Sequence, residues 1–114
     1  MRRFLAALGA TAAVATVVVA TAIPATLHNG QGSSCPAGSV GVYHFVNNQT
    51  GGATAAGTLM ASFTDGSSWT VTAYKVNQNT QHFLVESEGA LITASTNLPG
   101  RLVLSDFSCV DVKK

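Results

Sequence analysis

Two cysteines are the residues of this chain whose chemistry is most constrained. Cys35 and Cys109 are its only cysteines, and they bracket most of the patterned sequence. In an oxidising compartment two cysteines admit a single intramolecular pairing, so the sequence predicts a Cys35–Cys109 disulfide. Closing so long a loop would stabilise the fold by about 4 to 5 kcal/mol in the chain-entropy model.

Catalytic residue spacings are not found in the sequence. It has no Gly-x-Ser-x-Gly, no Gly-rich phosphate loop, no His-Glu-x-x-His and no Cys-x-x-Cys. His44 and His82 would form a metal site only if their strands were neighbours, and we expect ordinary surface or half-buried histidines instead. The sequence therefore predicts a protein that is not an enzyme and carries no metal or other cofactor.

Carboxamide side chains are concentrated between the patterned stretches of the sequence. They are Asn47, Asn48, Gln49, Asn77, Gln78, Asn79 and Asn97. Carboxamides donate and accept hydrogen bonds without charge, which suits hydroxyl-rich ligands such as glycans, and Tyr43 and Tyr74 offer stacking surfaces. The candidate ligand-binding set is therefore Asn48, Gln49, Asn77, Asn79, Asn97, Tyr43 and Tyr74. The alternative is that Asn and Gly simply build the turns.

The first residues predict export. Arg2 and Arg3 precede a weakly hydrophobic run that ends in small residues, so residues 1–22 are interpreted as a signal peptide cleaved after Ala22. An uncleaved membrane anchor is the alternative, because the run is about 20 residues long and could span a bilayer. Its Ala and Thr content and the following Pro24 favour cleavage. We expect a secreted or extracellular protein, with the cell envelope also open, and no stable membrane insertion.

The charge balance limits the class of partner. Without Arg2 and Arg3, four basic and five acidic residues remain, a net charge of −1. Nucleic acids and anionic lipids require clustered cations, so we expect neither as a partner. Residues 23–38 are rich in Gly, Ser, Asn and Gln without periodicity, which predicts a flexible tether before a single β domain over residues 39–114.

Apolar and polar residues alternate with a period of two through most of the remaining sequence. The expected strands are 40–47, 53–64, 68–76, 81–86, 90–96 and 101–111. The predicted fold is all-β: a small antiparallel β-sandwich, or a partly closed barrel, of about six strands, with one disulfide between the terminal strands.

The hairpin around Asp65 has two candidate registers. A two-residue Asp-Gly turn would pair Ser62 with Trp69 and mix the apolar and polar faces. A three-residue loop over residues 65–67 instead sets Phe63 opposite Trp69 and gives one apolar and one Thr/Ser face. We therefore predict the three-residue loop, with Trp69 in the core.

Strands that reverse direction in succession gather alternate loops at the same end of the domain. Loops 47–52, 77–80 and 97–100 should share one end, which we name the amide end. Asp65, Glu86, Glu88 and Asp111 should lie at the other, the cysteine end. No calcium-loop spacing is present, so we expect the carboxylates to form a solvated edge.

Two classes of function follow from these expectations. The first is a secreted, non-catalytic recognition module that binds an extracellular or cell-surface ligand, such as a glycan, through the amide-rich loops. The alternative is a secreted protein-facing factor, either an enzyme inhibitor or a cell-envelope assembly component. A ligand site should be concave between loops, an inhibitor should present a protruding loop, and an assembly component should have a long uncovered edge strand.

Overall fold

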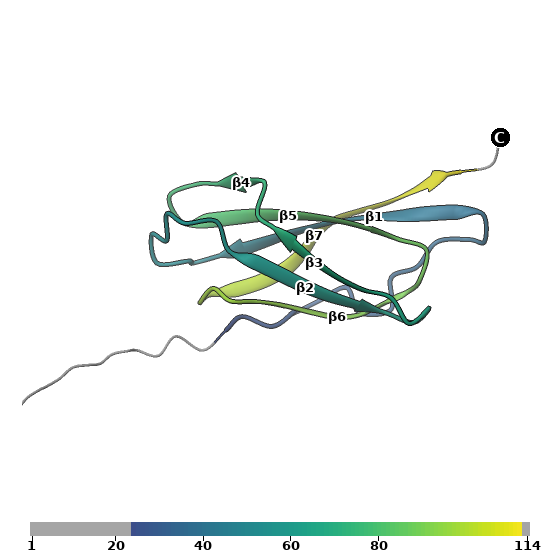
Figure 1. Cartoon of the computed structure of the whole chain (residues 1–114), viewed down its shortest axis with the longest axis horizontal. Coiled ribbons are helices and arrows are strands. Elements are labelled where there is room, and N and C mark those ends of the chain that lie inside the picture. Colours follow the sequence, from purple (N-terminus) through teal and green to yellow (C-terminus); the bar gives the residue numbers. More distant parts are fainter. Residues whose placement is uncertain (1–23, 113–114) are drawn as a thin grey trace, which may run out of the picture.

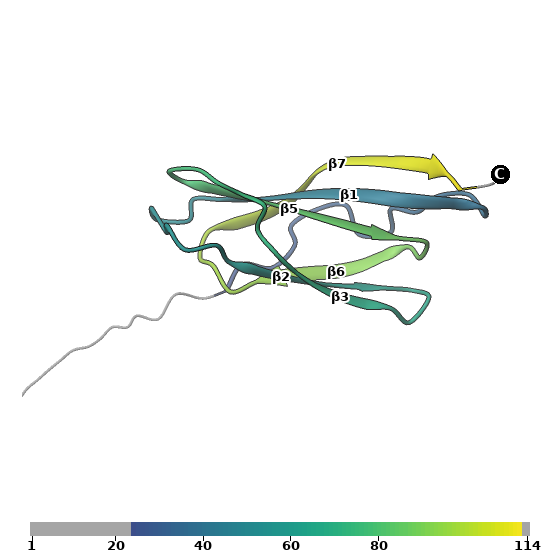
Figure 2. The same ribbon diagram turned by 45° about the horizontal axis from the view of Figure 1, so that its top comes forward.

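The structure, a computed structural model, describes residues 24–112 as two antiparallel sheets. The strands are β1 (Ser39–Asn48), β2 (Thr58–Phe63), β3 (Ser68–Thr72), β4 (Lys75–Val76), β5 (Thr80–Ser87), β6 (Leu91–Thr96) and β7 (Arg101–Asp111). One sheet has the order β4-β5-β1-β7 and the other β3-β2-β6, and they form the two layers of a sandwich (Figures 1 and 2). The predicted all-β sandwich is confirmed, and it is not a closed barrel.

The core lies between the two sheets and follows the period-two pattern of the sequence. Tyr43 and Phe45 point inward from β1 and are fully buried, as are Phe83 on β5 and Leu59 on β2. Burying each such side chain stabilises the fold by about 1.5 to 3 kcal/mol. No helix in residues 24–112 is long and apolar enough to cross a membrane.

The strand predicted over residues 68–76 crosses from one sheet to the other. β3 pairs with β2 as far as Thr72. The Ala73 N–H then donates to the Gly57 carbonyl, and the Tyr74 N–H donates to the His82 carbonyl on β5, each at 3.0 Å. Apolar and polar residues keep alternating through this crossing, which is why the pattern resembles a single strand.

The β2–β3 register differs from the prediction by two residues. Ala61, not Phe63, lies opposite Trp69, and Ser62 lies opposite Ser68. The loop keeps an odd length, so the two faces of the hairpin are as predicted, but it spans residues 63–67. The Asp65 carboxylate accepts hydrogen bonds from the Ser67 N–H at 2.9 Å and from the Ser67 hydroxyl at 2.6 Å, which closes this wider turn.

Trp69 is not a core residue, contrary to the prediction. Its side chain is 48% exposed although it shares a face with the buried Ala61. The reason is that β3 is the edge strand of its sheet, so the opposite sheet does not cover its inward face completely. An edge position cannot be read from the alternation of a single strand.

Residues 25–33 also differ from the expected flexible tether. Ala25 and Leu27 are buried, at 4% and 7% exposure. The Ala25 N–H donates to the Leu98 carbonyl and its own carbonyl accepts from the Thr96 N–H, while the Leu27 N–H donates to the Ala94 carbonyl. This segment therefore lies along β6 as part of the fold. The Gly and Ser content of the segment does not indicate this pairing, because hydrogen bonds between backbone groups need few apolar side chains.

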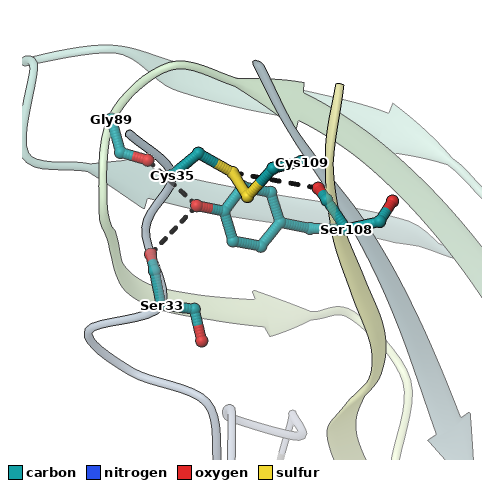
Figure 3. Close-up of a disulfide and its surroundings, with 6 residues drawn as sticks. Ser33, Cys35, Gly89, Ser108 and Cys109 are labelled. Carbon is teal, nitrogen blue, oxygen red and sulfur yellow. Dashed lines mark hydrogen bonds between the residues drawn. A yellow bond between two sulfur atoms is a disulfide. The ribbon is translucent and has the colours of Figure 1, made fainter. Parts of the chain in front are cut away.

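The predicted disulfide is present between Cys35 and Cys109, with the two Cα atoms 5.7 Å apart. It joins the end of the N-terminal segment to β7 (Figure 3). Disulfides of this kind are typical of proteins in oxidising compartments.

Candidate functional site

The three amide-rich loops gather at one end of the sandwich, as the strand parity predicts (Figure 1). The Thr50 N–H donates to the Asn79 carbonyl at 3.3 Å, and the Gly51 N–H donates to Asn79 Oδ1 at 3.1 Å. Asn47 Nδ2 donates to the Pro99 carbonyl at 2.8 Å. The loops around Asn47, Asn79 and Pro99 are therefore tied to one another.

Several carboxamides at this end hold the loops in place. Asn47 is fully buried and accepts a 2.6 Å hydrogen bond from the Thr96 hydroxyl. Asn97 Oδ1 accepts from the Thr58 N–H at 2.9 Å, and Asn77 Nδ2 donates to the Thr80 hydroxyl at 3.2 Å. The side chains of these residues and of Asn79 therefore form hydrogen bonds that build the turns.

Gln81 is a buried carboxamide at this end that is not among the predicted site residues. Its Oε1 accepts from the Gly57 N–H at 2.7 Å, and its Nε2 donates to the Ala55 carbonyl at 3.0 Å. The sequence does place Gln81 at an inward-facing position of a predicted strand. Because a buried carboxamide needs hydrogen-bond partners, this position could have indicated that Gln81 holds a neighbouring loop.

The carboxamides left for a ligand are fewer than the sequence suggests. Within residues 24–112, the side chains of Asn48, Gln49 and Gln78 make no hydrogen bond to the protein. Gln49 and Gln78 are exposed, and Gln49 has a positive φ of 58° that turns the chain after β1. These three side chains can therefore form hydrogen bonds to a bound molecule.

A hollow of about 540 Å³ lies between two loops at the amide end. Its walls are Gly52, Ala53, Thr54, Val76, Asn77 and Gln78. An adjoining hollow is lined by Gly51, Gly52, Gln78 and Asn79. The lining side chains are all uncharged, and Gln78 belongs to both hollows.

Tyr43 cannot stack on a ligand, contrary to the prediction, because it is fully buried. Its hydroxyl lies 3.0 Å from the carbonyls of both Ser33 and Gly89 (Figure 3). Burial, with a smaller contribution from the charge of Asp65, raises the pKa of the Tyr43 hydroxyl, which keeps it a hydrogen-bond donor. Tyr43 thus fixes the N-terminal segment to the turn before β6.

Tyr74 is exposed, but it lies away from the amide-end hollow. Its ring is 6.1 Å, centroid to centroid, from the rings of both His44 and His82. Tyr74 and His44 line a hollow of about 390 Å³ together with Val42, Leu84 and Asp106. Of the two predicted stacking surfaces, only Tyr74 is accessible.

The structure brings His44 and His82 together, because β1 and β5 are neighbouring strands. His44 Nε2 lies 3.0 Å from His82 Nδ1, and Asp106 Oδ2 lies 3.9 Å from His44 Nδ1. Partial burial, followed by the charges of His44 and Lys75, lowers the pKa of His82. In the described part of the chain no three His, Cys, Asp or Glu side chains converge as a metal ion would require.

A second aromatic surface lies at the cysteine end, around the exposed Trp69. This groove of about 300 Å³ is lined by Val40, Asp65, Ser67, Trp69, Glu86, Ser87 and Glu88. The sequence predicts these carboxylates at one end of the domain but predicts Trp69 in the core. The edge position of β3 is what exposes the indole.

No family model matches this chain, and no similar curated protein or solved structure was found. Function is therefore inferred from the geometry of the two ends.

Proposed function

We propose that this protein is a secreted, non-catalytic recognition module that binds an uncharged, hydroxyl-rich extracellular ligand, such as a glycan, at the amide end. The leader-like residues 1–22 and the Cys35–Cys109 disulfide support export. Loops on a rigid β scaffold are a common location for binding sites.

The uncharged hollow between residues 51–54 and 76–79 is the observation that carries the proposal. Its walls combine small apolar groups from Ala53 and Val76 with the free carboxamide of Gln78. Carboxamides pair with sugar hydroxyls as both donors and acceptors. The Asn79 contacts to Thr50 and Gly51 hold the two loops at a fixed separation, which lowers the entropy lost on binding.

A glycan array probed with the purified, disulfide-intact chain tests this proposal. We expect binding to at least one neutral glycan, nearly unchanged between 0.05 and 0.5 M NaCl, because uncharged contacts are not screened. Gln78→Ala should weaken binding about 2- to 10-fold, the effect of losing one or two hydrogen bonds. It should not change the melting temperature, since the side chain has no partner in the described residues.

Thr70→Ala is the matched control, because Thr70 is exposed on β3 far from the amide end and should not affect binding. Absence of any neutral-glycan binding would contradict the proposal. So would binding that disappears at high salt, or equal losses in the Gln78 and Thr70 variants.

A protein-facing role is the second candidate, and the edge strand β7 favours it. The N-terminal segment covers the start of this edge, where the His28 N–H donates to the Leu102 carbonyl at 2.9 Å. Along residues 105–110, no other strand within residues 24–112 pairs with β7 on the side away from β1. An assembly component would associate through this edge, which concentration-dependent sedimentation would detect.

A further inference from the structure

The groove at the cysteine end lies on an open side of the sandwich. Trp69 projects from the edge strand β3, and Val40 and Glu86 belong to β1 and β5 of the opposite sheet. Trp69 is 48% exposed, so part of its indole is available to a ligand. The groove is thus a cleft between the two sheets with an aromatic ring in its wall.

Hydrogen bonds between two turns fix the shape of this groove. The Thr64 N–H donates to the Ala90 carbonyl and the Ala90 N–H donates to the Thr64 hydroxyl, both at 2.9 Å. The Asp65 carboxylate is oriented by the Ser67 N–H and hydroxyl. The walls are therefore organised before any ligand arrives.

The charged side chains in the groove are all acidic: Asp65, Glu86 and Glu88. Hydrogen bonds from Ser67 lower the pKa of Asp65, which keeps it ionised at neutral pH. Within residues 24–112, the side chains of Glu86 and Glu88 have neither an ion pair nor a hydrogen bond; the Asp106 contact with His44 involves another surface. Among the described residues that line the groove, three are acidic and none is basic.

An aromatic face beside carboxylates favours a cationic ligand, through cation–π attraction and charge pairing. A guanidinium fits this arrangement, because its plane stacks on an indole while its N–H groups pair with a carboxylate. Quaternary ammonium sites usually enclose the cation in several aromatic rings, whereas this groove offers one. We propose that the Trp69 groove binds an arginine side chain from a basic segment of a partner polypeptide.

The intrinsic fluorescence of Trp69 reports on this groove directly, because Trp69 is the only tryptophan in the chain. The probe is an acetylated tetra-arginine amide, and its control is the same peptide with citrulline, which keeps the shape and removes the charge. We expect the arginine peptide to change the emission in a saturable way, with weaker binding as NaCl rises from 0.05 to 0.5 M. The citrulline peptide should bind at least 10-fold more weakly.

Variants separate this site from the rest of the surface. Measured by the anisotropy of a labelled peptide, Glu88→Gln should weaken binding about 2- to 5-fold, and Trp69→Leu should weaken it further. Asp106→Asn removes the same charge from a different face and should have little effect. Gln78→Ala should also leave peptide binding unchanged, so this inference and the amide-end proposal can fail separately.

Equal binding of the citrulline peptide would overturn the inference, as would equal losses in the Glu88 and Asp106 variants. Choline that displaces the arginine peptide at lower concentrations than free arginine would assign the groove to quaternary ammonium ligands instead. If the arginine peptide changed neither the emission nor the anisotropy, the groove would not be an arginine-binding site. Circular dichroism melts establish that each variant is folded.

Discussion

The contact between His44 and His82 shows how one pair of side chains couples the fold to pH. A neutral pair satisfies the 3.0 Å contact with one donor and one acceptor. Two protonated rings would have only donors there and would repel each other. The lowered pKa of His82 follows first from burial and then from the charges of His44 and Lys75.

We therefore expect the free energy of unfolding to fall as the pH drops below about 6.5, the ordinary pKa of histidine. With its pKa lowered in the folded state, His82 binds more protons when unfolded, so protonation favours unfolding. Urea titrations between pH 8 and pH 5 measure this loss. His82→Gln should reduce the dependence on pH over that range, and an unchanged slope in the variant would contradict the assignment to His82.

The candidate site could be predicted only in part at the level of residues. Asn79 and Gln78 lie where strand parity places them, but the sequence cannot show that the Asn79 side chain is used to hold the loops. Tyr43 and Trp69 have the opposite of their expected exposure: the tyrosine is buried and the tryptophan is exposed. Burial depends on the order of strands in the sheets, which a single sequence does not give.

At the scale of elements, alternation located most strands, but β2 begins at Thr58 and not at residue 53, and the strand expected over residues 68–76 is divided between β3 and β4. β1 and β7 lie within a residue of their expected limits. The β2–β3 register was wrong by two residues because a shift of two preserves both faces, so alternation cannot detect it. The N-terminal segment was missed because its pairing with β6 uses backbone groups that every residue has.

The N-terminal segment should contribute measurably to stability. Leu27→Ala should lower the free energy of unfolding by about 2 to 3 kcal/mol, as for a buried leucine near the edge of a core. Leu84→Ala is the control, since Leu84 is 45% exposed and the change should cost less than about 1 kcal/mol. Chemical denaturation measures both. Similar small losses in the two variants would mean that the segment is not packed as described.

At the scale of the whole molecule, the disulfide connects the N-terminal segment of the described residues to the last strand, β7. The double variant Cys35→Ser, Cys109→Ser should lower the free energy of unfolding by about 2 to 5 kcal/mol, because its unfolded chain loses the 74-residue loop constraint. Denaturant titration of the variant and the oxidised protein gives this difference. Two free thiols, found by mass spectrometry in protein purified without reductant, would contradict the bridge.

The two ends of the sandwich have different chemistry: an uncharged hollow at one, and an acidic groove with a tryptophan at the other. Strand parity placed the amide-rich and acidic loops at these ends, and the exposure of Trp69 adds the aromatic surface. Each end is bounded by turns that hydrogen bonds hold together. Binding at one end should therefore leave the other almost unchanged.

The most direct test of the amide-end site is amide-resolved NMR of the labelled protein during titration with neutral malto-, cello- and chito-oligosaccharides. We predict chemical-shift changes at the backbone amides of Gly51, Gly52 and Asn79 and at the side-chain amide of Gln78. The Trp69 indole should not shift. Changes centred on Trp69, or no change with any of these sugars, would contradict the claim that the uncharged hollow is the binding site.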